Sequence, residues 1–136
     1  MTVHVREFRG AGPTVTRSRR GALACLSGAM AEDNVATRYQ AAGAEILARR
    51  WRGRAGEIDL IVQQGDCVIF VEVKKSRTHE LAALRLDRRQ MDRICGAALE
   101  YCGTLSSGSL TEMRFDVALV DDSGRIDVIE NAFGEN

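Results

Sequence analysis

Three charged residues stand where two apolar stretches of the chain would otherwise form buried strands. Asp59 lies within the apolar run at 58–62, Glu72 lies within the run at 68–73, and Lys74 follows directly. A carboxylate inside a buried strand costs several kcal/mol unless it is paired with a cation or holds a metal ion. Charge alone therefore leaves two explanations open, which are ion pairs with neighbouring Arg or Lys side chains and a functional site.

The use of lysine favours a functional site. Seventeen of the nineteen basic residues are arginine, and the two lysines are adjacent at Lys74 and Lys75. Lysine offers a compact charge that fits beside a water molecule or a phosphate oxygen, whereas arginine presents a broad planar fork. Because side chains alternate along a strand, Glu72 and Lys74 point to one face and Lys75 points to the other. Lys74 is therefore the better candidate for chemistry.

Two carboxylates and one ammonium on paired strands form an arrangement that can hydrolyse phosphodiesters. Asp59 and Glu72, helped by the strand carbonyl of Val73, would hold Mg²⁺ or Mn²⁺ with several waters retained. The metal would lower the pKa of a bound water, and Lys74 would orient that water. The sequence therefore predicts catalytic and metal-binding roles for these residues.

Hydrophobic periodicity predicts the elements that must position these side chains. The second of two predicted helices has the clearest signal, because apolar residues recur at helical spacing from Met91 to Cys102. The strands on either side of a turn at 63–66 are expected to form a hairpin. The order α-β-β-β-α-β-β predicts a mixed sheet with helices packed against it. The predicted helices span 28–42 and 84–103, and the predicted strands span 44–50, 57–62, 67–75, 113–120 and 125–130.

Composition indicates one globular domain. The chain has 136 residues, of which 45% are hydrophobic and 28% are charged, which is ordinary usage for a protein with a single core. We expect the domain to span 21–136, preceded by a mobile basic arm at 1–20 that holds five Arg and one Glu. No apolar stretch approaches the roughly 18–20 residues that cross a bilayer.

The four cysteines indicate a reducing, cytoplasmic location. They lack the CxxC spacing of zinc sites, so we expect free thiols used as small apolar side chains. These cysteines are Cys25, Cys67, Cys95 and Cys102.

A series of short segments follows a fixed order along the chain. It consists of Glu32, ILARRWR at 46–52, GEIDLI at 56–61, FVEVK at 70–74, Ala97-Ala98 with Tyr101, RFDV at 114–117 and NAF at 131–133. This series covers about residues 21–133 and resembles the YraN family of predicted endonucleases, a branch of the restriction-endonuclease-like PD-(D/E)xK superfamily.

The resemblance implies a restriction-endonuclease-like fold, which is a mixed sheet flanked by helices, and Mg²⁺-dependent cleavage of DNA. It makes Asp59 and Glu72 metal ligands, Lys74 the catalytic lysine and Glu32 an additional acid from the first helix. Where the family commonly has a lysine on the second helix, this chain has Gln90, which some relatives in the superfamily use. A nucleic-acid-binding module of the same fold with little cleavage is the alternative.

Arginines near the predicted site could contact nucleic acid. Such side chains bind phosphates without choosing a sequence, although a solvated loop explains them equally well. Trp51, which lies among them, could stack on a base, but packing in the core is favoured. Aromatic residues make up 5% of the chain, so there is no broad stacking platform, and duplex or branched DNA is the more natural ligand. The arginines are Arg49, Arg50, Arg52, Arg54, Arg88 and Arg89, with Arg93 beside the last two.

Overall fold

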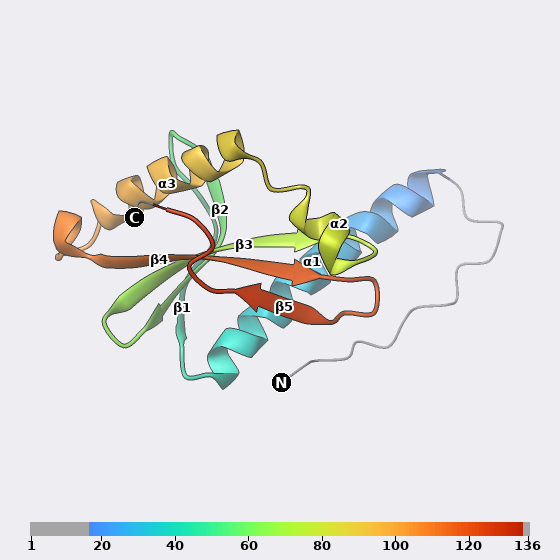
Figure 1. Cartoon of the computed structure of the whole chain (residues 1–136), viewed down its shortest axis with the longest axis horizontal. Helices are drawn as coiled ribbons and strands as arrows, with labels where there is room; N and C mark the ends of the chain where they lie inside the picture. The colour runs from blue at the N-terminus through green and yellow to red at the C-terminus, as the bar shows by residue number, and fades with distance from the viewer. Residues whose placement is uncertain (1–16, 135–136) are drawn as a thin grey trace.

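The computed structural model describes the backbone of residues 17–134 and the side chains of residues 28–134. A five-stranded sheet in the order β1-β2-β3-β4-β5 lies between helices (Figure 1). Strands β3 and β4 are parallel, whereas the other neighbouring pairs are antiparallel. The prediction of a mixed sheet flanked by helices is therefore confirmed. The elements are α1 (Arg17–Ala41), β1 (Glu45–Arg52), β2 (Glu57–Gln64), β3 (Cys67–Lys75), α2 (His79–Ala83), α3 (Arg88–Cys102), the 3₁₀ turn η1 (Gly108–Leu110), β4 (Glu112–Val120) and β5 (Ile126–Ile129).

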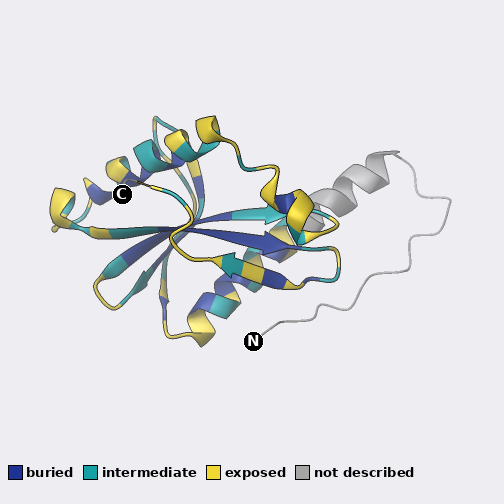
Figure 2. Ribbon diagram, viewed as in Figure 1, coloured by how far each residue is buried: buried dark blue, intermediate teal, exposed yellow. Residues whose placement is uncertain are grey.

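Two apolar layers hold the helices to the sheet. On one face Val35 of α1 packs with Val71 of β3, and on the other Ile94 of α3 packs with Phe70. Because side chains alternate along β3, the strand is buried on both faces over most of its length (Figure 2). The same alternation places Glu72 on the face that carries Phe70 and α3.

Several predicted boundaries were wrong. The first helix begins at Arg17 rather than at residue 28, since neither Gly21 nor Gly28 interrupts it. Residues 17–20 of the predicted arm therefore belong to α1, and the rest of that arm lies outside the described residues. Strands β1 and β2 extend beyond their predicted ends, to Arg52 and Gln64.

The predicted helix over 84–103 also begins too early. Asp87 has an extended backbone, and its side chain accepts a hydrogen bond from the Gln90 N–H at 2.8 Å. This N-cap starts α3 at Arg88. A separate short helix, α2, precedes it and is capped by Thr78, which accepts from the Leu81 N–H. The break between the helices places Gln90 in the first turn of α3.

Three of the four cysteines lie among the residues whose side chains are described. Cys67 and Cys102 are free thiols, as expected, Cys95 is half-buried on α3, and the side chain of Cys25 lies outside the described residues. Among residues 17–134, no helix is both long enough and apolar enough to span a membrane.

A buried carboxylate ties α1, β4 and the C-terminal segment together. Asp116 is fully buried and accepts hydrogen bonds from the Tyr39 hydroxyl at 2.6 Å and from the Asn131 N–H at 2.9 Å. The Arg114 guanidinium adds two more, at 2.9 and 2.8 Å. Burial and the hydrogen bond to Asp116 raise the pKa of Tyr39. Asp116, the aspartate of the RFDV segment, is therefore a structural residue whose two carboxylate oxygens are both hydrogen-bonded.

Substitution Tyr39→Phe is expected to lower the free energy of unfolding by about 1.5–3 kcal/mol, because it removes a hydrogen bond to a buried charge. Urea denaturation measures this difference. Tyr101→Phe is the matched control, because the Tyr101 ring packs against Trp51 and Phe70 and its hydroxyl makes no hydrogen bond to a described residue. Equal losses in the two variants would contradict the assigned role of Asp116.

Candidate active site

The candidate site lies where β2 and β3 separate. The two strands pair from Leu60 opposite Val71 through to the turn at Gly65. Beyond Leu60, the side chain of Asp59 accepts the Val73 N–H at 2.8 Å. A carboxylate oxygen thus replaces a backbone acceptor, and this bond fixes Asp59 at the edge of the gap.

Glu72 is the centre of this cluster. It is 4% exposed, and its Oε2 lies 3.1 Å from the Lys74 Nζ. The Gln90 side-chain amide of α3 donates a hydrogen bond to the same oxygen. The buried carboxylate of Glu72 is therefore held by Lys74 of its own strand and by the Gln90 amide of α3.

The carboxyl groups of Asp59 and Glu72 lie within hydrogen-bonding reach of each other. Burial, together with the hydrogen bond and charge of Glu72, raises the pKa of Asp59 well above its usual range. The Val73 N–H and the Lys74 charge oppose this shift without cancelling it. Lys74 therefore does not compensate both acids, and ion pairing explains Glu72 but not Asp59.

Glu32 approaches this cluster from α1. Its Oε1 lies 3.1 Å from the Arg50 guanidinium, while burial and the nearby Asp59 raise its pKa. The structure thus brings Asp59, Glu72, Lys74 and Gln90 into contact and places Glu32 beside them. Their roles in catalysis stay predictions.

Arg50 has an unusual backbone for a strand residue. Its φ is +49°, in the left-handed region that side chains with a Cβ disfavour. The register of its neighbours, Arg49 with Leu60 and Trp51 with Ile58, places it opposite Asp59. Strained residues of this kind concentrate at functional sites, and this one directs its side chain to Glu32.

Arg50→Gly is expected to be more stable than Arg50→Ala by about 1 kcal/mol, because glycine adopts a positive φ without a steric penalty. Both variants lose the Glu32 ion pair, so the comparison isolates the backbone. Chemical denaturation of the two proteins gives the difference. An alanine variant at least as stable as the glycine variant would show that the residue is unstrained.

Most arginines that were predicted to bind nucleic acid contact acidic side chains. Arg49 lies 2.8 Å from Asp33, and Arg50 is paired with Glu32. Arg52 and Arg88 lie 3.9 Å from Glu57 and Asp92 respectively, while both stay exposed. Within the described part of the chain, the side chains of Arg54 and Arg89 form no ion pair with an acidic side chain, although the backbone N–H of Arg54 and then its charge help to lower the pKa of Glu100.

Trp51 packs in the core, as favoured from the sequence. Its ring meets the edge of Tyr101 with centroids 5.3 Å apart, and it joins the apolar layer under α3. It is therefore not free to stack on a base.

The acidic pair suits one kind of metal ion. Among the described residues, no group of three or more His, Cys, Asp or Glu side chains is arranged to hold a metal. Mg²⁺, however, is usually bound by one or two carboxylates and keeps several waters. Asp59 and Glu72 offer two such ligands in contact, and a cation between them would relieve their repulsion. For Val73, the structure shows the N–H bond to Asp59, and the ligand role of its carbonyl stays a prediction.

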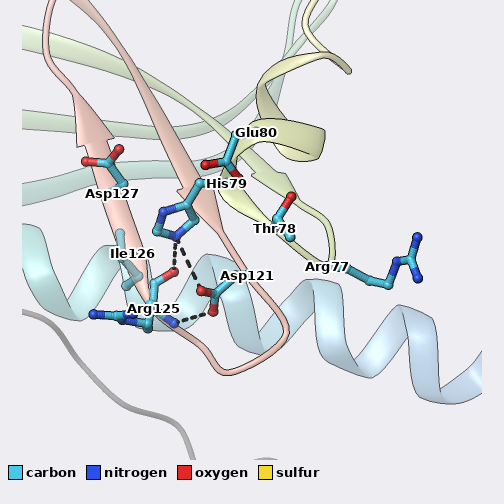
Figure 3. Close-up of a pocket in the computed structure, with 8 residues that line it drawn as sticks. All are labelled: Arg77, Thr78, His79, Glu80, Asp121, Arg125, Ile126 and Asp127. Carbon is cyan, nitrogen blue, oxygen red and sulfur yellow. Dashed lines mark hydrogen bonds and ion pairs between the residues drawn. The ribbon is translucent and has the colours of Figure 1, made fainter.

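A separate polar hollow lies at the start of α2, beside the β4–β5 hairpin (Figure 3). Its volume is about 430 Å³. His79 is held there by the Arg125 carbonyl at 2.9 Å and lies 3.8 Å from Asp121. None of the residues predicted for the site lines this hollow, so it is distinct from the carboxylate cluster.

One residue near the site was missed by the sequence analysis. Glu100 of α3 accepts hydrogen bonds from the backbone of the β1–β2 turn, at Arg54 and Ala55. It lies forty-five residues from Ala55 in the chain, and no local pattern indicates the contact.

Comparison with known proteins identifies the family. Residues 31–120 match the model of "Uncharacterised protein family UPF0102". The chain belongs to the UPF0102 family. This confirms the resemblance to YraN, and the matched residues include every residue predicted for the site.

Curated members of the UPF0102 family align along nearly their whole length. A UPF0102 protein of Cereibacter sphaeroides (strain ATCC 17029 / ATH 2.4.9) is 56% identical over 113 residues, which cover 83% of this chain and 97% of the relative. One of Ruegeria pomeroyi is 52% identical, over 85% of this chain and 94% of the relative. One of Roseobacter denitrificans is 44% identical, over 90% and 95%.

Proposed function

We propose that this protein is a Mg²⁺- or Mn²⁺-dependent nuclease that hydrolyses phosphodiester bonds of DNA. The observation that supports it best is the meeting of two carboxyl groups, the partly buried Asp59 and the buried Glu72, beside a single lysine, Lys74, 3.1 Å from Glu72. A structural ion pair needs one acid for one lysine. The second acid is explained by a divalent cation that the pair would share.

Each residue of the cluster has a distinct part in this proposal. Asp59 and Glu72 would hold the metal, which when bound stabilises charge on the phosphate and lowers the pKa of a bound water. Lys74 would donate a hydrogen bond to the attacking water or to a phosphate oxygen, since its Nζ lies beside Glu72. Gln90 fixes the orientation of Glu72 through its amide, and the Val73 N–H does the same for Asp59.

The exposed arginines support a nucleic acid as substrate. Arg54 precedes the β2 strand that carries Asp59, and Arg89 precedes Gln90 on α3. Both side chains are exposed. Phosphate contacts from these two arginines would hold a duplex without reading its sequence.

A nucleic-acid-binding module without efficient cleavage is the second candidate. Glu72 Oε2 already accepts from both Lys74 and Gln90, so the lysine is engaged in an ion pair. A net charge of zero at pH 7 is compatible with either function, because the charge is unevenly distributed along the chain.

Cleavage assays decide between the two candidates. Linear, nicked and branched DNA, with single-stranded RNA for comparison, would be incubated with Mg²⁺, with Mn²⁺ and with EDTA. The proposed nuclease cuts at least one DNA substrate with a metal and none with EDTA. A protein that binds DNA and cuts nothing with either metal is the binding module.

A further inference from the structure

The turn between β1 and β2 is fastened to α3 by one carboxylate. Glu100 Oε2 accepts the Arg54 N–H at 2.8 Å, and Oε1 accepts the Ala55 N–H at 2.7 Å. Both oxygens are thus used on consecutive backbone donors. The turn is also closed on itself, because the Gly53 N–H donates to the Gly56 carbonyl at 2.9 Å. Such a pair of charge-assisted bonds fixes both the position and the orientation of the turn.

Glycines allow the turn to lie directly on the helix. A Cβ at Gly96 of α3 would lie 2.9 Å from the Ala55 Cβ, which is too close for any side chain. A Cβ at Gly53 would lie 2.8 Å from the Trp51 ring and 2.9 Å from the Glu100 carboxylate. The turn and the helix therefore meet with no space for rearrangement.

The turn that carries Arg54 packs on the part of α3 that carries two further arginines. Gly56 packs on Arg93, since a Cβ at Gly56 would lie 3.3 Å from the Arg93 Cβ. Arg89 is one helical turn before Arg93, and it directly precedes Gln90, which contacts Glu72. An exposed row of arginines thus leads from the turn to the carboxylate cluster.

The spacing of this row suits a duplex. Gly56 lies three residues before Asp59 in the chain, so the turn is about 10 Å along the strand from the cluster. That length corresponds to about three base pairs of DNA at 3.4 Å each. One duplex could therefore place a phosphate at Arg54 and, about three base pairs away, a phosphodiester at the carboxylate cluster.

We propose that Glu100 is a positioning residue, which holds the β1–β2 turn in place so that Arg54 binds a backbone phosphate of duplex DNA. This inference rests on the proposed function for the choice of ligand. Glu100 itself contacts no phosphate and acts through the turn.

The direction of the change in DNA affinity shows whether Glu100 acts by positioning Arg54 or only through its negative charge. Removing a negative charge close to a phosphate-binding surface strengthens binding on electrostatic grounds. If Glu100 positions Arg54, neutralisation of Glu100 weakens DNA binding instead, because the β1–β2 turn is no longer held on α3.

The test measures affinity for a 20-base-pair duplex by fluorescence anisotropy in EDTA with the full chain. Glu100→Gln is expected to raise Kd by about three- to tenfold and to reduce the slope of log K against log salt by about 0.9, the loss of one phosphate contact. The matched control is Glu45→Gln, an exposed acid at the opposite end of β1, which is expected to bind at least as tightly as wild type.

Two further variants guard against an indirect effect. Gly96→Ala pushes the turn away without changing charge and replaces glycine by a better helix former, so it is expected to weaken binding while the helix stays intact. Adding Glu100→Gln to Arg54→Ala is expected to cause no further loss, because both changes remove the same contact. Thermal unfolding confirms that each variant is folded.

The outcomes distinguish this inference from the proposed function. A Glu100→Gln protein that binds as tightly as wild type or more tightly overturns the positioning role, as does full additivity with Arg54→Ala or a wild type that does not bind duplex DNA at low salt. A wild type that binds duplex DNA but cuts nothing contradicts the nuclease activity and leaves the positioning role standing.

Discussion

Replacement of Lys74 by alanine is expected to lower the rate of DNA cleavage at saturating substrate by at least about 10²-fold, the usual effect of losing a positioned proton-transfer or charge-stabilising group. Its ammonium lies 3.1 Å from Glu72 and would act on charge that develops in the transition state. Arg54 and Arg89 would contact phosphates that are already charged in the ground state. Affinity for DNA is therefore expected to change little in this variant, and the loss should be in kcat.

The neighbouring lysine provides the control for this experiment. Lys75 points to the other face of β3 and lies 3.3 Å from Asp122, away from the cluster. Lys75→Ala is expected to keep most of the wild-type cleavage rate. A Lys74→Ala protein that cuts as fast as Lys75→Ala would remove Lys74 from the chemistry.

Asp59→Asn is expected to abolish binding of Mg²⁺ or Mn²⁺ and, at the same time, to stabilise the metal-free protein. The asparagine oxygen can still accept the Val73 N–H, so the gap between the strands keeps its shape. The substitution removes the partly buried acid that lies against the buried Glu72, and a gain of about 1–2 kcal/mol at pH 8 follows from relieving their repulsion. Such a gain in stability with loss of function is common at binding sites.

The pH dependence gives this prediction a sign. The folded-state pKa of Asp59 is raised above its unfolded value, so the folded protein holds this proton more tightly. Wild-type stability therefore falls as the pH rises from about 4 through the raised pKa. The asparagine variant lacks this dependence, and its advantage should be larger at pH 8 than at pH 5.

Calorimetric titration with Mg²⁺ or Mn²⁺ measures metal binding, and urea denaturation in EDTA measures the stability of the metal-free protein. Asp66→Asn is the control, because Asp66 is exposed in the turn between β2 and β3. It is expected to change neither metal binding nor stability appreciably. Metal binding that persists in Asp59→Asn would exclude this residue as a ligand.

Local sequence patterns predicted the parts of the fold that depend on periodicity. The apolar strands of the β2–β3 hairpin and the apolar face of α3 were visible because burial repeats at two and at about 3.6 residues respectively. The carboxylates were visible for the opposite reason, since Asp59 and Glu72 interrupt that pattern.

Other features depend on contacts between distant segments, which periodicity does not encode. Arg50 is paired with Glu32 of α1, so a side chain that looked free in the sequence is engaged in the structure. Glu100 resembles any exposed helix residue until the β1–β2 turn is placed over it. The break before α3 was missed because Asp87 can cap a helix or lie on its surface, and only tertiary packing decides between them.

In the proposed function, Glu72 and its neighbours hydrolyse phosphodiesters with a divalent cation. The most direct measurement compares cleavage of the same DNA, with Mn²⁺ and with EDTA, by wild type, Glu72→Gln and Glu112→Gln purified in parallel. Glu112 is an exposed residue at the start of β4, so its substitution controls for contaminating nucleases and for the loss of one negative charge. We expect wild type and Glu112→Gln to cut with the metal and not with EDTA, and Glu72→Gln to bind DNA without cutting it. Equal cleavage by all three proteins, or none by wild type, would contradict the proposed function.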